Sequence, residues 1–365
     1  MFDEYVQDPL ALERMCKRMR DAPWIAVDTE FVRERTYHAK LGLIQLANAS
    51  HVIGVDPLAV SSLDPLIDVL YAANVLKILH AARQDLEIFY DLHGSVPAPV
   101  FDTQIAAALA GFPEQISYAA LVASVLGVEL EKHHTRTDWA KRPLSDAQLR
   151  YAEEDVRYLR DLQHVLAERL AALGRSSWLT QECARLTHSE LYRNDPENAH
   201  ARIKHGHTLT PAGQHVLRAL AHWREATAQQ QNLPRNWVLR DAVLFELAQR
   251  LPKSPAELKR IKGLGARSIR KWGTAIIETI STAGLSAPAE PLWAPPKPLD
   301  AQQAALCERM LKLLRVRARE QGLSPTLIAS RRDIQALVRG DTSGPLLSGW
   351  RQQLVGEDLL AIGKA

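Results

Sequence analysis

The sequence predicts an α/β domain with a mixed central sheet over residues 1–200, followed by two segments made of helices alone. Up to residue 200, short apolar runs of strand type alternate with apolar patterns of helical spacing. Beyond it the strand signals stop, and a proline-rich stretch at 287–299 divides the helical remainder. A chain of 365 residues also exceeds the usual size of one hydrophobic core, so several domains are expected.

Five strands are predicted in the first domain, because five runs are short, rich in Val, Ile and Leu, and bounded by polar or turn residues. They lie at 24–31, 41–47, 51–56, 75–80 and 100–103. Only short turns separate the first three, so we expect an antiparallel meander there. The last two follow helical segments and can pair in parallel, which makes the sheet mixed.

Helices are predicted wherever apolar residues recur at helical spacing. In the first domain they lie at 62–73, 83–94, 103–112, 117–127 and 145–173. In the second half they lie at 210–231, 240–251, 254–261 and 265–282, and then at 301–322, 324–340 and around 348–362. The two basic helical segments are similar in size and in the order of their helices, which suggests a weak internal duplication.

These patterns set the expected domain boundaries. We expect one domain at 1–200, a helical domain at 208–286, a linker at 287–299 and a divergent helical domain at 300–365. No apolar run is long enough to span a bilayer, and the acidic, amphipathic start lacks a signal-peptide pattern, so the expected location is the cytoplasm. A monomer is expected because no exposed heptad seam is present.

Charge and cysteine content narrow the function classes. Residues 1–200 carry 20 Lys and Arg against 29 Asp and Glu, whereas residues 201–365 carry 25 against 13. The basic half indicates a nucleic-acid or other acidic partner, with charge that is merely solvated as the alternative. The three cysteines, Cys16, Cys183 and Cys307, are far apart, which argues against a disulfide framework and a thiolate zinc site.

Two carboxylates stand side by side where the first strand ends. Asp28 and Glu30 are two residues apart on a strand, so both side chains project to the same face. Two like charges about 4 Å apart repel by about 4 kcal/mol at an effective dielectric constant of about 20. A bound cation, a raised pKa or open water must relieve this repulsion, and without metal we expect a raised pKa in one of the pair.

Two further motifs place acids near strand or helix ends. Asp85 lies in the first turn of a helix that follows a strand, where the helix dipole favours a carboxylate and capping alone could explain it. Tyr151 and Asp155 are four residues apart on a helix and share one face, and a surface pair is the alternative.

Taken together, these motifs are similar to those of a known enzyme family. The chain resembles the DEDD superfamily of 3′→5′ exonucleases, in the subgroup with a tyrosine in the third motif, and within it the bacterial ribonuclease D family. The resemblance covers residues 10–200 and rests on AVDTEF with RERTYHAKLGLIQLA behind it, ILHAARQDLEIFYD, VFDTQIAAAL and TRTDWAKRPLSDAQLRYAEEDVRYL. It implies a ribonuclease H-like exonuclease domain with a mixed sheet.

The resemblance also implies a metal site. Asp28, Glu30, Asp85 and Asp155 match the family's four acids, which hold two divalent cations, Mg²⁺ or Mn²⁺. By resemblance, Asp28 bridges both ions, Glu30 and Asp155 hold the ion that activates water, and Asp85 holds the other. Tyr151 would orient the attacking water. The adjacent His133 and His134 are interpreted as surface residues, because no third ligand lies near them in the sequence.

Contacts to substrate are less strongly marked. Phe31 either stacks on the last base or belongs to the core, and Gln45 is either structural or in contact with the terminal nucleotide. Arg35, like Arg33, either meets phosphate or is solvated. Trp139 either lines the exit path of the strand or packs under a loop.

The stretch from NLPRNWVLRD to GTAIIETI resembles an HRDC domain, a small helical nucleic-acid-binding module, and 300–365 would be a second one by position. Its KGLGARSIRK turn offers glycines before a helix start together with four cations, and a purely structural turn is the alternative. The four cations are Lys262, Arg267, Arg270 and Lys271.

The resemblance implies a 3′→5′ exoribonuclease that releases nucleoside 5′-monophosphates during 3′-end processing of stable RNA. The implied partners are transfer RNA precursors with 3′ extensions. Two alternatives stay open from the sequence: a DNA repair or proofreading exonuclease, since only contacts to the 2′-hydroxyl would discriminate, and a nucleic-acid-binding protein whose nuclease site is inactive.

Overall fold

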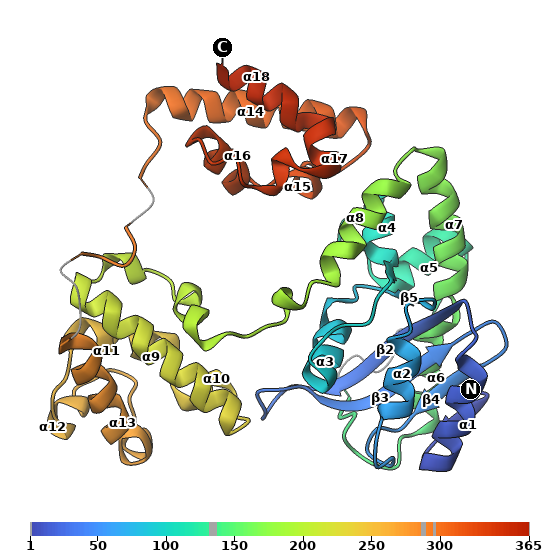
Figure 1. Cartoon of the computed structure of the whole chain (residues 1–365), viewed down its shortest axis with the longest axis horizontal. Coiled ribbons are helices and arrows are strands. Elements are labelled where there is room, and N and C mark those ends of the chain that lie inside the picture. Colours follow the sequence, from blue (N-terminus) through green and yellow to red (C-terminus); the bar gives the residue numbers. More distant parts are fainter. Residues whose placement is uncertain (1, 131–136, 286–289, 295–296, 365) are drawn as a thin grey trace. The chain divides into compact units, whose positions relative to one another are not determined.

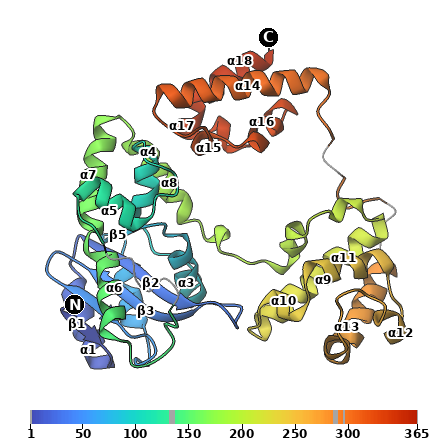
Figure 2. The same cartoon turned by 180° about the vertical axis from the view of Figure 1, so that it is seen from behind.

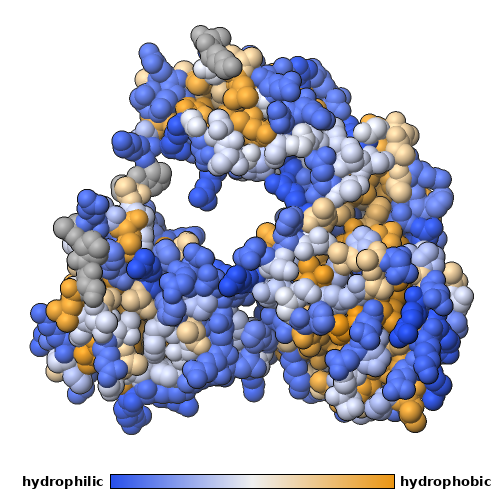
Figure 3. Space-filling model, in the orientation of Figure 1, coloured by the Kyte–Doolittle hydropathy of each residue, from blue (hydrophilic) through white to orange (hydrophobic). Residues whose placement is uncertain are grey.

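The computed structural model describes residues 2–130, 137–285, 290–294 and 297–364 (Figure 1). The chain divides into two compact units. The first contains Met1–Val32, Leu41–Tyr192 and Leu299–Ala365, and the second contains Arg33–Lys40 and Arg193–Pro298. Among the described residues, no helix is long and apolar enough to cross a membrane. On the face drawn in Figure 3, hydrophilic and hydrophobic residues are interspersed. The domain boundaries expected from the sequence stay predictions.

Six strands of the described residues form one sheet in the first unit, in the order β1-β4-β3-β2-β5-β6. Their bounds are Glu4–Val6, Trp24–Val32, Lys40–Ala47, Val52–Val55, Leu76–Leu79 and Val100–Asp102 for β1 to β6. β3 and β4 are antiparallel, whereas β1 pairs with β4, β2 with β5 and β5 with β6 in parallel. The mixed sheet and all five predicted strands are confirmed. β1 was not predicted, because three residues are too few to show an alternating pattern.

Helices cover the sheet on both faces (Figures 1 and 2). They are α1 (Pro9–Met19), α2 (Asp64–Leu70), α3 (Arg83–His93), α4 (Thr103–Leu109), α5 (Tyr118–Leu126), α6 (Asp146–Arg157), α7 (Leu159–Ala172) and α8 (Ser176–Leu186). Ile25, Ala26 and Val27 of β2 are all buried, as expected for a strand that is covered on both faces. After this buried run, Asp28 is the first residue of the central strand that is partly exposed.

The predicted helix at 145–173 is interrupted at Tyr158, which ends α6 with φ −100° and ψ 1°. The interruption has a specific cause, because the hydroxyl of Tyr118 enters the helical hydrogen-bond ladder. This hydroxyl donates to the carbonyl oxygen of Glu154 at 2.8 Å and accepts from the backbone N–H of Tyr158 at 3.2 Å. A hydroxyl thus takes the place of the bond that a continuous helix would make between these two backbone groups.

The second unit is built mainly from helices (Figure 1). They are α9 (Pro211–Gln230), α10 (Arg235–Val238), α11 (Asp241–Arg250), α12 (Pro255–Leu258) and α13 (Ala266–Leu285). Two 3₁₀ segments of the same unit precede them, η2 (Pro196–Arg202) and η3 (Gly206–Thr208). A further 3₁₀ turn, η1 (Ser189–Leu191), comes before these and lies in the first unit. Leu217, Leu244 and Ile276, from α9, α11 and α13, lie in one buried cluster. The four predicted helices of this segment are therefore confirmed.

Residues 33–40 pack on α9 and α10 and belong to this unit, although they follow β2 in the sequence. The hydroxyl of Tyr37 donates to the buried carboxylate of Glu225 and accepts from Arg235 Nη2 at 2.8 Å, and the Arg235 guanidinium lies 4.7 Å from the Tyr37 ring centre. Asn232 Oδ1 accepts from the backbone N–H groups of Tyr37 and His38 at 3.0 and 3.1 Å. Sequence periodicity carries no sign of this network.

Replacing Glu225 with alanine is expected to destabilise the second unit strongly. Glu225 is 1% exposed and accepts two hydrogen bonds from Arg235, at 2.6 and 2.7 Å, so its loss leaves the partly buried guanidinium without this partner. Losing hydrogen bonds to a charged group in this way costs about 2–3 kcal/mol. Hydrogen exchange of α9 amides should show that loss in opening free energy, whereas the exposed Glu278→Ala should change it by less than about 1 kcal/mol. Equal effects would contradict this account.

The C-terminal segment repeats the start of the second unit. α14 (Ala301–Glu320), α15 (Pro325–Ile328) and α16 (Arg331–Val338) follow one another as α9, α10 and α11 do. The residue that ends the short helix is extended in both, with φ −152° at Leu239 and φ −157° at Ala329. The resemblance ends there, because short pieces replace α13: η4 (Pro345–Leu347), α17 (Gly349–Arg351), the π-helical η5 (Gln352–Gly356) and α18 (Glu357–Lys364).

Candidate active site

Three acids from two distant parts of the sequence meet at the end of β2. Asp28 and Glu30 leave the strand on one face, and Asp155 comes from α6. Each offers a carboxylate oxygen, and these oxygens lie within 4.8 Å of one another. Hard divalent cations such as Mg²⁺ prefer carboxylate ligands, so the donor set fits such an ion.

Asp85 lines the same cavity from the first turn of α3. It is 6% exposed, and its Oδ1 accepts a hydrogen bond from the Thr29 hydroxyl at 2.5 Å. Thr29 lies between Asp28 and Glu30 in the sequence, but its side chain hydrogen-bonds to Asp85. The cavity measures about 360 Å³ and brings together the five residues predicted as catalytic. Its lining is Asp28, Thr29, Glu30, Phe31, His80, Ala81, Gln84, Asp85, Tyr118, Tyr151 and Asp155.

A fifth acid, Asp102, fixes the turn that begins α3. Its Oδ1 and Oδ2 accept from the backbone N–H groups of Ala81 and Ala82 at 3.2 and 2.8 Å, and it also caps α4. Ala81 has φ +56°, a left-handed conformation that a non-glycine residue adopts only when its surroundings hold it. Asp102 therefore positions the turn that carries Asp85. The N-cap pattern D-T-Q after a strand was the signal that could have indicated it.

Burial raises the pKa of every acid in the cluster, and repulsion from the other cluster acids adds to this at Asp28 and Glu30. Burial is the largest cause for Asp28, whose pKa is well above its ordinary value, followed by the charges of Asp85, Asp155 and Glu30. The same causes raise the pKa of Glu30 to about 8. Burial also raises the pKa of Asp85 and of Asp155 to about 7. The raised pKa expected from the D-x-E spacing is present at both of its acids.

Tyr151 lies one helical turn before Asp155 and hydrogen-bonds to its carboxylate. Burial and the charge of Asp155 raise the pKa of Tyr151, so its hydroxyl stays protonated near neutral pH and can donate. Both residues lie on the predicted helix face. The structure therefore brings together the tyrosine and the acid of the third motif as the sequence predicted.

Tyr118 and His80 line the cavity but were not predicted. The Tyr118 hydroxyl occupies the interruption after α6, three residues beyond Asp155. Its ring packs edge-on against His80 at 5.7 Å, and His80 Nδ1 and Nε2 contact Thr103 Oγ1 and the Ile116 carbonyl oxygen at 2.9 and 3.0 Å. Burial lowers the pKa of His80. These two residues hold the wall beside Asp155.

Tyr118→Phe is expected to reduce kcat about 10- to 100-fold with little change in KM. The substitution removes the two hydrogen bonds of the Tyr118 hydroxyl, each worth about 1 kcal/mol. The Tyr158 N–H can then bond directly to the Glu154 carbonyl oxygen, so that α6 and α7 form one continuous helix and Asp155 is displaced. Steady-state hydrolysis of RNA would measure the effect. The matched control, Tyr71→Phe, removes a similarly half-buried hydroxyl bonded to backbone carbonyls outside the cavity. Unchanged kcat in Tyr118→Phe would contradict the positioning role.

The predicted substrate contacts lie in different places. Phe31 lines the acidic cavity. Gln45 has no exposed surface, donates to Asp28 Oδ2 at 3.2 Å and leaves its buried Oε1 without a partner among the described residues. Trp139 is 4% exposed, packs against Gly42 and lies 6.3 Å from the Tyr151 ring, outside the cavity lining. These positions agree with the structural alternatives for Gln45 and Trp139, whose substrate roles stay predictions.

The predicted cations belong to the second unit. Arg35 is exposed in the 33–40 segment. The four cations of the KGLGARSIRK turn are exposed around the start of α13, and Gly263 has the left-handed φ of +84° that the turn needs. Lys271 Nζ donates to Gln231 Oε1 at 3.2 Å. His133 and His134 lie outside the described residues.

Comparisons with known proteins agree with this site. The sequence pattern of the 3′-5′ exonuclease family matches residues 4–171, and that of the HRDC domain matches residues 214–280. Ribonuclease D of Jannaschia sp. (strain CCS1) is 41% identical over 363 residues, which cover 96% of this chain and 92% of that protein. The chain belongs to the ribonuclease D family. Ribonuclease D of Pseudomonas paraeruginosa (strain DSM 24068 / PA7) is 36% identical over 363 residues, covering 98% of this chain and 96% of that protein.

A solved structure matches across the whole chain. The crystal structure of Escherichia coli RNase D superposes with a TM-score of 0.89 at 33% identity and covers 99% of this chain and 98% of that one. Membership of the ribonuclease D family makes the chain a 3′→5′ exoribonuclease, a phosphodiester hydrolase. The fold class, the family and the reaction predicted from the sequence are confirmed. The alternatives of a DNA repair nuclease and an inactive binding protein are not supported.

Proposed function

We propose that Asp28, Glu30, Asp85 and Asp155 hold two divalent ions, Mg²⁺ or Mn²⁺, and that Tyr151 orients the attacking water. The observation that carries this proposal is the convergence of the acids in one cavity, where burial raises the pKa of each and repulsion adds to it at Asp28 and Glu30. Two such ions, when bound, supply water activation, stabilisation of transition-state charge and help for the departing 3′ oxygen. The carboxylates here fit that group because every ligand is a hard oxygen donor.

The side chains around the acids have separate tasks in this proposal. The Thr29 hydroxyl donates to Asp85 Oδ1 and so orients this carboxylate. Gln45 fixes Asp28 through Oδ2. Tyr151, whose hydroxyl proton is donated to Asp155, would orient the attacking water by accepting a hydrogen bond from it. That water adds to the phosphorus of the last phosphodiester, while the 3′ oxygen of the shortened chain leaves. The product is a nucleoside 5′-monophosphate.

We further propose that the substrates are transfer RNA precursors with 3′ extensions. Two observations support this class. Escherichia coli RNase D is described as an exoribonuclease involved in structured RNA processing, and the helical half of this chain is basic. Charge of that sign attracts RNA phosphates in a salt-dependent manner. We propose that the active form is a monomer, which light scattering of the purified protein would test.

The experiment compares a 3′-extended transfer RNA with a single-stranded DNA that carries the same extension, each with Mg²⁺ or with EDTA. We expect mononucleotides to be released from the RNA only with Mg²⁺, and the release to stop near the mature 3′ end. Tyr151→Phe should slow release about 10- to 100-fold and leave RNA affinity in EDTA unchanged. Release that continues with EDTA would contradict the metal proposal, and equal hydrolysis of the DNA would contradict the substrate class.

A further inference from the structure

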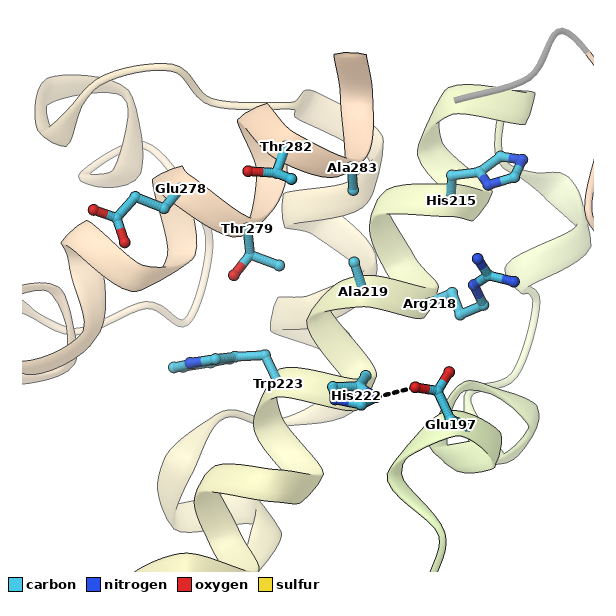
Figure 4. A pocket seen from close by; sticks show the side chains of 10 residues that line it. All are labelled: Glu197, His215, Arg218, Ala219, His222, Trp223, Glu278, Thr279, Thr282 and Ala283. Atoms are coloured by element: carbon cyan, nitrogen blue, oxygen red, sulfur yellow. Dashed lines mark ion pairs between the residues drawn. The ribbon is translucent and has the colours of Figure 1, made fainter. Parts of the chain in front are cut away.

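A groove crosses the second unit between α9, α13 and the 3₁₀ turn η2 (Figure 4). Its volume is about 590 Å³. Ala219 of α9 and Ala283 of α13 are its small residues, and polar side chains stand on both sides of Ala219 in Figure 4. The complete lining is Glu197, His215, Arg218, Ala219, His222, Trp223, Glu278, Thr279, Thr282 and Ala283. None of these residues belongs to the acidic cavity or to the KGLGARSIRK turn.

One side of the groove is suited to an anion. His215, Arg218 and His222 recur at helical spacing on α9 and point to the same side in Figure 4. Arg218 is exposed and has no ion pair or hydrogen bond within the described parts of the chain. His222 Nδ1 lies 3.0 Å from Glu197 Oε1, so that acid is already paired, and His215 Nε2 is buried without a hydrogen-bond partner among the described residues. The arginine is thus available to a phosphate.

Aromatic rings continue the groove toward the start of α13. Trp223 lines the groove and is half-buried, and its ring packs edge-on against Trp272 of α13 with 5.8 Å between ring centres. Lys271 Nζ lies 4.3 Å from the Trp272 ring centre. Arg270 and Arg267 precede Lys271 on the same helix and are exposed. Cations therefore flank a pair of aromatic rings along these two helices.

We propose that the α9–α13 groove binds single-stranded RNA, with one phosphate at Arg218 and one base against Trp223. Cations that follow the backbone, together with aromatic rings on which bases stack, are the chemistry by which proteins hold single strands without reading their sequence. The other rim adds the hydroxyls of Thr279 and Thr282 and the carboxylate of Glu278, which can contact ribose hydroxyls. This inference rests on the proposed function, because it assigns the groove to the RNA that the exonuclease shortens.

The test measures binding of a 5′-fluorescein-labelled 20-nucleotide oligoadenylate to the full chain by fluorescence anisotropy, with EDTA present to prevent hydrolysis. Arg218→Ala should weaken binding about 5-fold and should lower the slope of log K against log salt by about 0.7, the value for one phosphate contact with a single strand. Trp223→Leu should weaken binding about 5- to 100-fold. Lys253→Ala, which removes an exposed lysine of the same unit outside the groove, is the matched control.

The outcomes separate this inference from the proposed function. Loss of affinity in Arg218→Ala with a reduced salt slope, and none in Lys253→Ala, supports the groove. An unchanged affinity and slope in Arg218→Ala overturns it even if Trp223→Leu binds less well, because Trp223 also packs against Trp272. Hydrolysis of the 3′-extended transfer RNA with Mg²⁺ is measured in parallel. Wild-type protein that fails to release mononucleotides from that RNA overturns the proposed function, whatever affinity the anisotropy gives.

Discussion

Asp28→Asn is expected to abolish RNA hydrolysis and also to make the metal-free protein harder to unfold. Asp28 has the acid neighbours Glu30, Asp85 and Asp155, and all four pKa values are raised. A neutral amide of the same shape removes one source of repulsion, so near pH 8 the free energy of unfolding in EDTA should rise by about 1–3 kcal/mol. The amide removes a charged metal ligand as well, so kcat/KM should fall at least about 1,000-fold.

Urea unfolding in EDTA and release of mononucleotides from 5′-labelled RNA in Mg²⁺ would measure the two effects. Asp161→Asn is the matched control, because Asp161 is exposed in the first turn of α7 and lies outside the cavity lining. It should leave hydrolysis unchanged and alter stability by less than about 1 kcal/mol. A variant at Asp28 that is both inactive and less stable in EDTA would mean that the repulsion is relieved in the folded protein by something other than protonation.

The sequence predicts which side chains share a face for two pairs of site residues, because this geometry is local. The pairs are Asp28 with Glu30, and Tyr151 with Asp155. Alternation along a strand puts the first two on one face, and a spacing of four residues puts the other two on one helix face. The meeting of the two pairs depends on the packing of α6 against β2, which a single sequence does not encode in its periodicity. The resemblance to a family supplied that step.

The features that were missed depend on contacts between distant residues. The interruption at Tyr158 is caused by a hydroxyl 40 residues earlier, so the helical pattern at 145–173 shows no break. Asp102 fixes the turn at Ala81 and Ala82 from 21 and 20 residues away. The placement of residues 33–40 depends on Tyr37 and Glu225, which are 188 residues apart.

Gln45 shows where a correct pattern leaves the role open. Its position amid LGLIQLA predicted a strand, and β3 is confirmed. The same pattern allowed either a structural amide or a contact to substrate. The structure places Gln45 in full burial with Nε2 on Asp28, because β3 and β2 are neighbours in the sheet. The predicted meander already placed these two strands side by side, but the register that brings Gln45 to Asp28 is not encoded in the sequence pattern.

Without metal, the protein is expected to lose stability as the pH rises from about 4 to about 8. The pKa of Glu30 is about 8, and those of Asp85 and Asp155 are about 7, whereas the same groups in an unfolded chain titrate near 4. Folding therefore takes up protons throughout this window, and stability falls as those protons are lost. One pKa unit corresponds to 1.36 kcal/mol, so Glu30 alone opposes folding by roughly 3–5 kcal/mol at pH 8.5.

Added Mg²⁺ should reverse this trend, because a divalent ion replaces the protons as the source of positive charge and binds only the folded site. Thermal unfolding in EDTA should give a lower Tm at pH 8.5 than at pH 6, and the rise in Tm on adding Mg²⁺ should be larger at pH 8.5. The double variant Asp28→Asn with Asp155→Asn separates the site from histidines and other titrating groups. It should lose most of the Mg²⁺ effect and part of the pH effect, because Glu30 and Asp85 stay buried and still titrate. The contradicting result is a wild-type protein in EDTA that is equally stable at pH 6 and pH 8.5, with the same behaviour in the double variant. It would mean that burial does not raise the pKa values of the four acids in solution.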